Sequence, residues 1–159
     1  EREYWVKLVR NSDSAPGLPE DEIVVQEVEA GDGLLFGDIS ARGFGRPPII
    51  AHWMGATVGD PRWRHYLACI DGQPAGAAAM YWHDGYAWLG IGSTLPEFRQ
   101  RGVQQRLITA RLQAGLALGV KYFVAETESR NVSCGNLIKA GFEVAYERCN
   151  FGIAPTITP

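Results

Sequence analysis

The stretch that decides the fold reads Thr94-Leu-Pro-Glu-Phe-Arg-Gln-Arg-Gly-Val-Gln-Gln-Arg106. A strand-like segment precedes it, a proline ends that strand's hydrogen-bond ladder, and a helical pattern opens directly after Gly102. A helix N-terminus presents unpaired N–H groups and a partial positive charge, and glycine lets the backbone approach a ligand closely. Because Arg99, Arg101 and Arg106 add cations, the stretch predicts an anion site of the kind that holds a pyrophosphate. The alternative is an ordinary strand-to-helix connection with solvated arginines.

Strands and helices are expected on both sides of this stretch. Upstream of it we expect a strand over 1–10, a linker over 11–21, a strand over 23–28, helices around 34–39 and 49–54, and strands over 64–70, 75–82 and 86–95. Downstream of it we expect a helix over 103–118, a strand over 122–125, a helix over 132–139, a strand over 142–148 and a frayed tail over 153–159. This order predicts an α/β (α+β) fold with a mixed, mostly antiparallel central sheet flanked by helices. Segments 86–95 and 122–125 should run parallel, and residues 22–152 should form the main domain.

The first ten residues carry an apolar and aromatic strand pattern, and a turn-rich linker separates them from the rest. Such a segment needs a surface on which to bury its side chains. We expect it at the edge of a sheet, either in this domain or in a second copy of the chain. The second arrangement would make a homodimer.

Composition excludes several classes of protein. The chain has 159 residues, of which 46% are hydrophobic and 21% charged, as in a single soluble domain. No uncharged apolar run is long enough to cross a membrane, and the net charge of −3 argues against a nucleic-acid partner. The three cysteines and three histidines lack metal-ligand spacing, so we expect no metal. An odd number of scattered cysteines favours a reducing cytoplasm.

Residues 99–104, Arg-Gln-Arg-Gly-Val-Gln, resemble motif A of the GCN5-related N-acetyltransferase (GNAT) superfamily, written (Arg/Gln)-x-x-Gly-x-(Gly/Ala). The first four positions match, and Gln104 departs at the last. Residues 131–142, Asn-Val-Ser-Cys-Gly-Asn-Leu-Ile-Lys-Ala-Gly-Phe, resemble the superfamily's last helix and its Gly-Phe ending. The strand order from residue 23 to residue 148 also fits. The resemblance therefore covers most of the chain and leaves residues 1–21 outside it.

The resemblance implies the acyl-CoA N-acyltransferase (GNAT) fold and transfer of an acetyl group from acetyl-CoA to a small-molecule or peptide amine. It assigns one strand to the pantetheine arm, the loop N–H groups to the pyrophosphate, and the start of the last helix to further contacts. The residues concerned are Gly92, Ser93, Thr94, Gln100, Arg101, Gly102, Val103, Gln104, Gln105, Asn131, Ser133 and Asn136. For Asn136, an amide that caps or braces the helix is an alternative.

The chemistry needs a neutral amine, so a base must take a proton from the ammonium. The resemblance places a catalytic glutamate near Glu126, which we expect at the end of its strand. Glu128 competes for the role, and a carboxylate in solvent or in a salt bridge is the alternative. Many relatives carry a tyrosine in the last helix that helps the thiolate leave, where this chain has Leu137. The acid is then another group such as Tyr146, or water, or none.

Aromatic residues add one further expectation. Trp63 and Trp82 are expected in the core, as aromatic residues in strands usually are. Trp53 is placed where relatives shape the acceptor site.

Two alternatives to an enzyme remain. One is a non-catalytic acetyl-CoA-binding module, which Gln104 and Leu137 favour, and the other is a structural or interaction domain.

Overall fold

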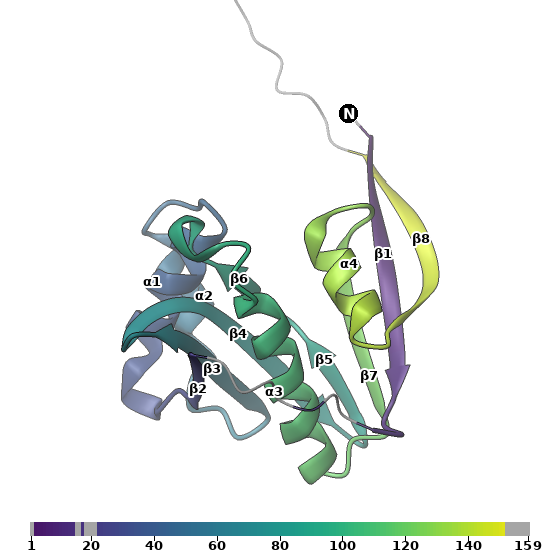
Figure 1. Ribbon diagram of the computed structural model, residues 1–159, viewed down its shortest axis with the longest axis horizontal. Coiled ribbons are helices and arrows are strands. Elements are labelled where there is room, and N and C mark those ends of the chain that lie inside the picture. Colours follow the sequence, from purple (N-terminus) through teal and green to yellow (C-terminus); the bar gives the residue numbers. More distant parts are fainter. Residues whose placement is uncertain (1, 15–16, 18–21, 152–159) are drawn as a thin grey trace, which may run out of the picture.

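A computed structural model describes residues 2–14, 17 and 22–151 (Figure 1). Glu1, most of the expected linker and the expected tail lie outside the described residues. The elements are β1 (Arg2–Asn11), β2 (Ile23–Glu27), η1 (Ala30–Asp32), α1 (Gly33–Gly43), α2 (Ile50–Gly55), β3 (Trp63–Ile70), β4 (Gln73–His83), β5 (Tyr86–Leu89), β6 (Gly92–Thr94), η2 (Pro96–Phe98), α3 (Val103–Ala117), β7 (Tyr122–Glu128), α4 (Val132–Lys139) and β8 (Glu143–Phe151). None of the helices in this described part of the chain is both long and apolar enough to cross a bilayer.

The strands form one sheet in the order β2-β3-β4-β5-β7-β1-β8, and β6 pairs with β4 beside this path. Within it, β5 and β7 run parallel, and the other described pairs are antiparallel. The expected α/β (α+β) class, with a mixed and mostly antiparallel sheet, is therefore confirmed. The parallel pair has the long helix α3 as its crossover, which is what a parallel connection requires.

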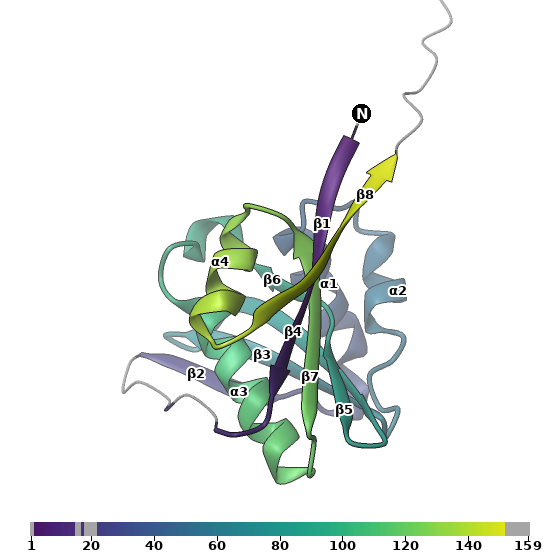
Figure 2. The same cartoon turned by 90° about the vertical axis from the view of Figure 1, so that its right-hand side faces the viewer.

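Helices cover both faces of the sheet, as Figures 1 and 2 show together. α3 and α4 lie on one face, where Ile108 and Leu112 pack in a fully buried cluster with Leu8 and Phe123. α1 lies on the other face, over β3 and β4, where Phe36 is fully buried, and α2 packs against α1. Packing of the helices on the two faces of the sheet positions the strand and helix ends that form the candidate site.

The N-terminal strand β1 lies between β7 and β8, antiparallel to both. Our expectation that it lies at a sheet edge is wrong, because β8 pairs with its outer side and forms the edge instead. The alternation of buried and more exposed side chains along β1 explains its inner position. Val6 and Leu8 are buried in the cluster under α4, and Lys7 is on the opposite face of the strand.

Several strand bounds differ from those expected, and two of the differences bear on the candidate site. The strand expected over 86–95 is divided into β5 and β6, with Gly90 and Ile91 between them. The strand expected to end at Ala125 continues as β7 to Glu128, because β1 pairs with it along that length. Both differences arise from pairing with distant strands, and both bear on the candidate site.

Candidate active site

The turn between β6 and α3 begins the site. Gln100 (φ 64°) and Gly102 (φ 83°) both adopt left-handed backbone conformations, and Gly102 is the residue before the first turn of α3. The first N–H groups of a helix have no partner within it and carry a partial positive charge. Gly102 accepts its conformation without strain, since it has no Cβ. The sequence thus builds a helix start that can hold an anion.

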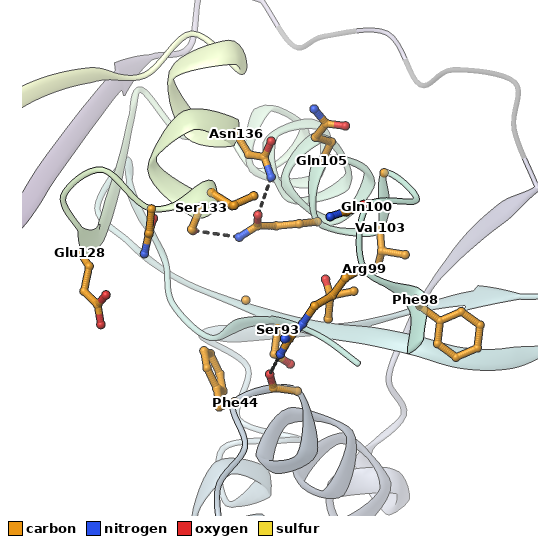
Figure 3. Close-up of a pocket in the computed structure, with 17 residues that line it drawn as sticks. Phe44, Ser93, Phe98, Arg99, Gln100, Val103, Gln105, Glu128, Ser133 and Asn136 are labelled. Carbon is orange, nitrogen blue, oxygen red and sulfur yellow. Dashed lines mark hydrogen bonds between the residues drawn. The ribbon is translucent and has the colours of Figure 1, made fainter. Parts of the chain in front are cut away.

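A cavity of about 820 Å³ lies against this helix start, between α3, α4 and β6 (Figure 3). All the residues expected to contact a cofactor line it except Arg101. Glu128 at the end of β7, expected only as a competing base, also lines it, and so does Phe44 at the end of α1, which the sequence did not indicate. Residues as far apart in the sequence as Phe44 and Asn136 therefore line one cavity.

The three arginines of the turn are used differently. Arg99 lines the cavity, and its Nη2 donates a hydrogen bond to the Gly43 carbonyl at 3.3 Å. Arg101 instead forms an ion pair with Glu22 and lies over the ring of Phe98. Arg106 donates from Nε to the carbonyl of residue 23, on β2. The expectation that Arg101 contributes to the site through its side chain is therefore not supported by its position.

Gln104, the residue that departs from the motif, connects α3 to α4. Its Nε2 lies 2.8 Å from Ser133 Oγ, and its Oε1 accepts from Asn136 Nδ2 at 2.6 Å; both bonds are drawn in Figure 3. Asn131 caps α4, because its Oδ1 accepts from the Cys134 N–H at 2.8 Å. The polar residues expected at the cofactor thus also brace the two helices that form the cavity.

β5 and β7 separate beside this cavity. Their parallel register ends at the pair Leu89 and Ala125, and beyond it β6 pairs with β4. The cofactor candidates Gly92, Ser93 and Thr94 form β6 and lie past this point. Within the described residues, one edge of β6 is thus open toward the cavity.

A buried arginine holds the break between β5 and β6, and sequence reasoning missed it. Arg111 of α3 is only 3% exposed. Its Nη1 donates to the carbonyls of Ala79 at 3.1 Å and Gly90 at 3.0 Å, and its Nε donates to Leu107 at 3.0 Å. Burial lowers the pKa of Arg111 to about 10, so the guanidinium stays protonated at neutral pH. In the sequence, the signal that could have revealed Arg111 is a charged residue within the apolar face of the expected helix.

A second cavity, of about 680 Å³, adjoins the first and shares Gly92, Gln104 and Glu128 with it. Glu126 lines this second cavity, inside β7 rather than at its end as expected. Its Oε2 accepts from Lys7 Nζ at 2.7 Å, and Arg148 forms an ion pair at Oε1 without hydrogen-bond geometry. The expected alternative of a salt-bridged carboxylate is thus present in the structure. Glu128 makes no ion pair within the described residues.

Comparison with known proteins identifies the family. The model of the acetyltransferase (GNAT) family matches residues 38–142 of the 159. The chain belongs to the GNAT acetyltransferase family. Among curated proteins, none gives a significant match.

Solved structures share the GNAT fold with this chain. A GCN5-related N-acetyltransferase from Sphaerobacter thermophilus is 23% identical, with a TM-score of 0.76, over 91% of this chain and 49% of that one. A GNAT-family acetyltransferase from Colwellia psychrerythraea is 20% identical, with a TM-score of 0.73, over 92% and 54%. A Clostridium acetobutylicum protein, described as a predicted acetyltransferase with acetyl-CoA, is 13% identical, with a TM-score of 0.63, over 76% and 90%. The chain spans about half the length of the first two relatives.

Two further GNAT candidate positions can be placed. Leu137 lines the second cavity and is buried, so a hydrocarbon side chain occupies the position where the resemblance led us to expect a tyrosine. Tyr146 lies on β8, opposite Lys7, with 52% of its surface exposed, and it lines neither cavity. The structure does not bring Tyr146 to the place where a leaving thiolate would need a proton.

Proposed function

We propose that this GNAT protein transfers the acetyl group of acetyl-CoA to a primary amine by direct attack. The observation that carries the proposal is the 820 Å³ cavity, which runs from the start of α3 to the break between β5 and β7. The helix start suits a pyrophosphate, and the open edge of β6 suits the peptide-like amides of a pantetheine arm. Arg99, which lines the cavity, adds positive charge for the phosphates.

In the proposed reaction, the amine nitrogen attacks the thioester carbonyl carbon. The C–N bond forms, the C–S bond breaks, and coenzyme A leaves as a thiolate. The nitrogen loses its second proton as the amide forms, and that proton passes through water to the thiolate, so coenzyme A is released as the thiol. The ammonium must first lose one proton, because its nitrogen otherwise has no lone pair. A thiolate is a fair leaving group, so the reaction does not require a side-chain acid. This fits the position of Tyr146 outside both cavities.

Glu126 is the proposed base, acting through a water. Lys7 and Arg148 contact its two oxygens, so protonation of the carboxylate removes the negative charge that both cations face. Glu128 is the competing base, since it lines both cavities and its carboxylate has no ion pair within the described residues. The two candidates are distinguishable because they lie two residues apart on one strand face and differ in their partners.

The test of the base compares Glu126→Gln with Glu128→Gln, the competing candidate, at saturating amine, so that a change in acceptor affinity does not enter kcat. Removal of a general base usually costs 10²–10⁴-fold, so Glu126→Gln should lower kcat by about that factor and leave acetyl-CoA affinity unchanged. The measurement is the pH–rate profile of each variant with one working amine. If the loss and the missing acidic limb appear in Glu128→Gln instead, the base is Glu128.

The test of the function itself measures release of the coenzyme A thiol with a panel of amines, peptides and protein N-termini. Acetyl-CoA at 100 times its dissociation constant should also stabilise the fold by about 2.7 kcal/mol, which a thermal-shift experiment detects. Stabilisation without thiol release would favour the non-catalytic acetyl-CoA-binding module, which is supported by the buried Leu137 where the resemblance expects a tyrosine. Absence of both would favour a structural or interaction domain.

We further propose a small-molecule or peptide amine as the acceptor and a cytoplasmic location. The second proposal is supported by Cys69, Cys134 and Cys149, all of which are unpaired thiols, as a reducing compartment favours.

A further inference from the structure

The second cavity is lined by three tryptophans that come from distant parts of the chain. Trp5 belongs to β1, Trp53 to α2 and Trp88 to β5. Other lining residues are also apolar, namely Ile50, Met54, Leu89, Ile91, Ile108 and Leu137. The sequence singled out Trp53 alone as an acceptor-site residue. The fold adds one tryptophan from the N-terminal strand and one from the strand that ends at the break.

These indoles are not core residues. Trp53 is 73% exposed and Trp88 is 41% exposed. Each aromatic side chain buries roughly 150–250 Å² when it is fully covered, so the two present a large apolar surface to whatever enters the cavity. Trp88 is also held in place, because Trp63 meets it edge to face with ring centroids 6.0 Å apart. Part of the aromatic wall is therefore formed before any ligand arrives, which lowers the entropy cost of binding.

The border between the two cavities is mainly polar, and Arg46, Arg111, Glu126 and Thr127 line the second cavity elsewhere. The shared lining consists of Phe44, Gly92, Gln104, Glu128, Asn131 and Ser133. The tryptophans and aliphatic side chains belong to the second cavity alone. An occupant that spans this cavity thus has a polar end at the shared border and a broad apolar body away from it.

Among the charged residues that line the second cavity, Glu128 is the carboxylate that can pair with a cationic ligand. Glu126 is held by Lys7 and Arg148, and Arg111 is committed to backbone carbonyls. Glu128 lies at the shared border, and its carboxylate has no ion pair within the described residues. Arg46, which is exposed, also lines the cavity. Its positive charge opposes a ligand that carries a second positive charge on its apolar part.

We propose that this cavity binds the acceptor as an amine carried on an aromatic or similarly broad apolar group. The ring lies against Trp53 and Trp88, and the ammonium lies beside Glu128, at the border where the thioester would be presented. The inference rests on the proposed acetyl transfer for its reaction, but the binding itself does not depend on it. It disfavours acceptors with several charges, such as polyamines, because their further ammonium groups would lose water beside aliphatic side chains and lie near Arg46.

The test combines binding and turnover. Calorimetry should show that 2-phenylethylamine and tryptamine bind more tightly than spermidine, and more tightly than uncharged 2-phenylethanol. Trp53→Ala and Trp88→Ala should each weaken binding of the two aromatic amines by about tenfold. Ile49→Ala is the matched control, because Ile49 is 74% exposed beside α2 and does not line the cavity. Glu128→Gln should weaken binding of 2-phenylethylamine and leave binding of 2-phenylethanol unchanged.

The outcomes separate this inference from the proposed function. If aromatic amines bind in a Trp53-dependent way but no amine releases thiol from acetyl-CoA, the proposed function fails and the pocket assignment holds. If thiol is released but spermidine gives the higher kcat/KM and both tryptophan variants behave like Ile49→Ala, the function holds and the aromatic acceptor is overturned. Circular dichroism of each variant confirms that it is folded before its binding is compared.

Discussion

At the residue scale, Gly102 is the position whose chemistry follows most directly from the sequence. Its φ of 83° is one that side chains rarely adopt, and a Cβ added there would meet its nearest described neighbour only at 3.8 Å. Strain rather than lack of space therefore limits substitution by alanine. Glutamate adds both bulk and negative charge at the place proposed for the pyrophosphate.

We expect Gly102→Glu to abolish measurable acetyl-CoA binding in a folded protein, and isothermal titration is the measurement. Gly119→Ala is the matched control, because Gly119 has a φ of 75°, follows α3 and has no atom within 4 Å of an added Cβ. Both substitutions should lower stability by about 1 kcal/mol through left-handed backbone strain, but only the change at residue 102 should affect the cofactor. Unchanged affinity in Gly102→Glu would refute the assignment of the loop.

At the scale of elements, the helix α3 is positioned by its close contact with β7. An added Cβ at Gly115 would lie 2.4 Å from the ring of Phe123, which is fully buried and has no room to move. α4 offers a comparison, because Gly135 is also helical and has nothing within 4 Å of an added Cβ. The two helices meet through Gln104 and the residues it bonds, so their spacing sets the width of the cavity.

Gly115→Ala should therefore destabilise the protein by about 1–3 kcal/mol, because overpacking outweighs the gain in helix propensity. Gly135→Ala should stabilise it by about 0.5–1 kcal/mol, because only the propensity changes. Urea denaturation monitored by circular dichroism measures both. Equal effects in the two variants would show that α3 can move away from β7.

At the scale of the whole molecule, the N-terminal strand joins the sheet together. Within the described residues, β8 is held in the sheet by its pairing with β1 alone. β1 also supplies Trp5 to the second cavity and Lys7 to Glu126. The segment that lies outside the family resemblance is thus part of the candidate site.

Deletion of residues 1–11 should lower the melting temperature markedly, because β8 loses its partner and the cluster around Leu8 is opened. Calorimetry is the measurement. If the deletion does not fold, Leu8→Ala provides the same test and should cost about 2–5 kcal/mol, since Leu8 is fully buried. Val9→Ala is its control on the exposed face of the strand. Equal stability of the two point variants would contradict the inner position of β1.

The sequence by itself determined the order and type of the main elements and the helix start at Gly102, but not the division of the segment 86–95 into β5 and β6. It also determined the class of the sheet, and the bounds expected for α4 agree with the structure. These features are local, because a turn glycine, a capping asparagine and the spacing of apolar residues act within a few positions of one another. The resemblance to GNAT proteins rests on the same local stretches.

Only the tertiary structure decided which distant residues meet. It placed β1 inside the sheet, extended β7 to Glu128, committed Arg111 to the break beside β6 and turned Arg101 toward Glu22. The Lys7–Glu126 ion pair joins residues that are 119 positions apart. No local pattern encodes such contacts, because strand pairing and ion pairing depend on which surfaces remain uncovered once the core has formed.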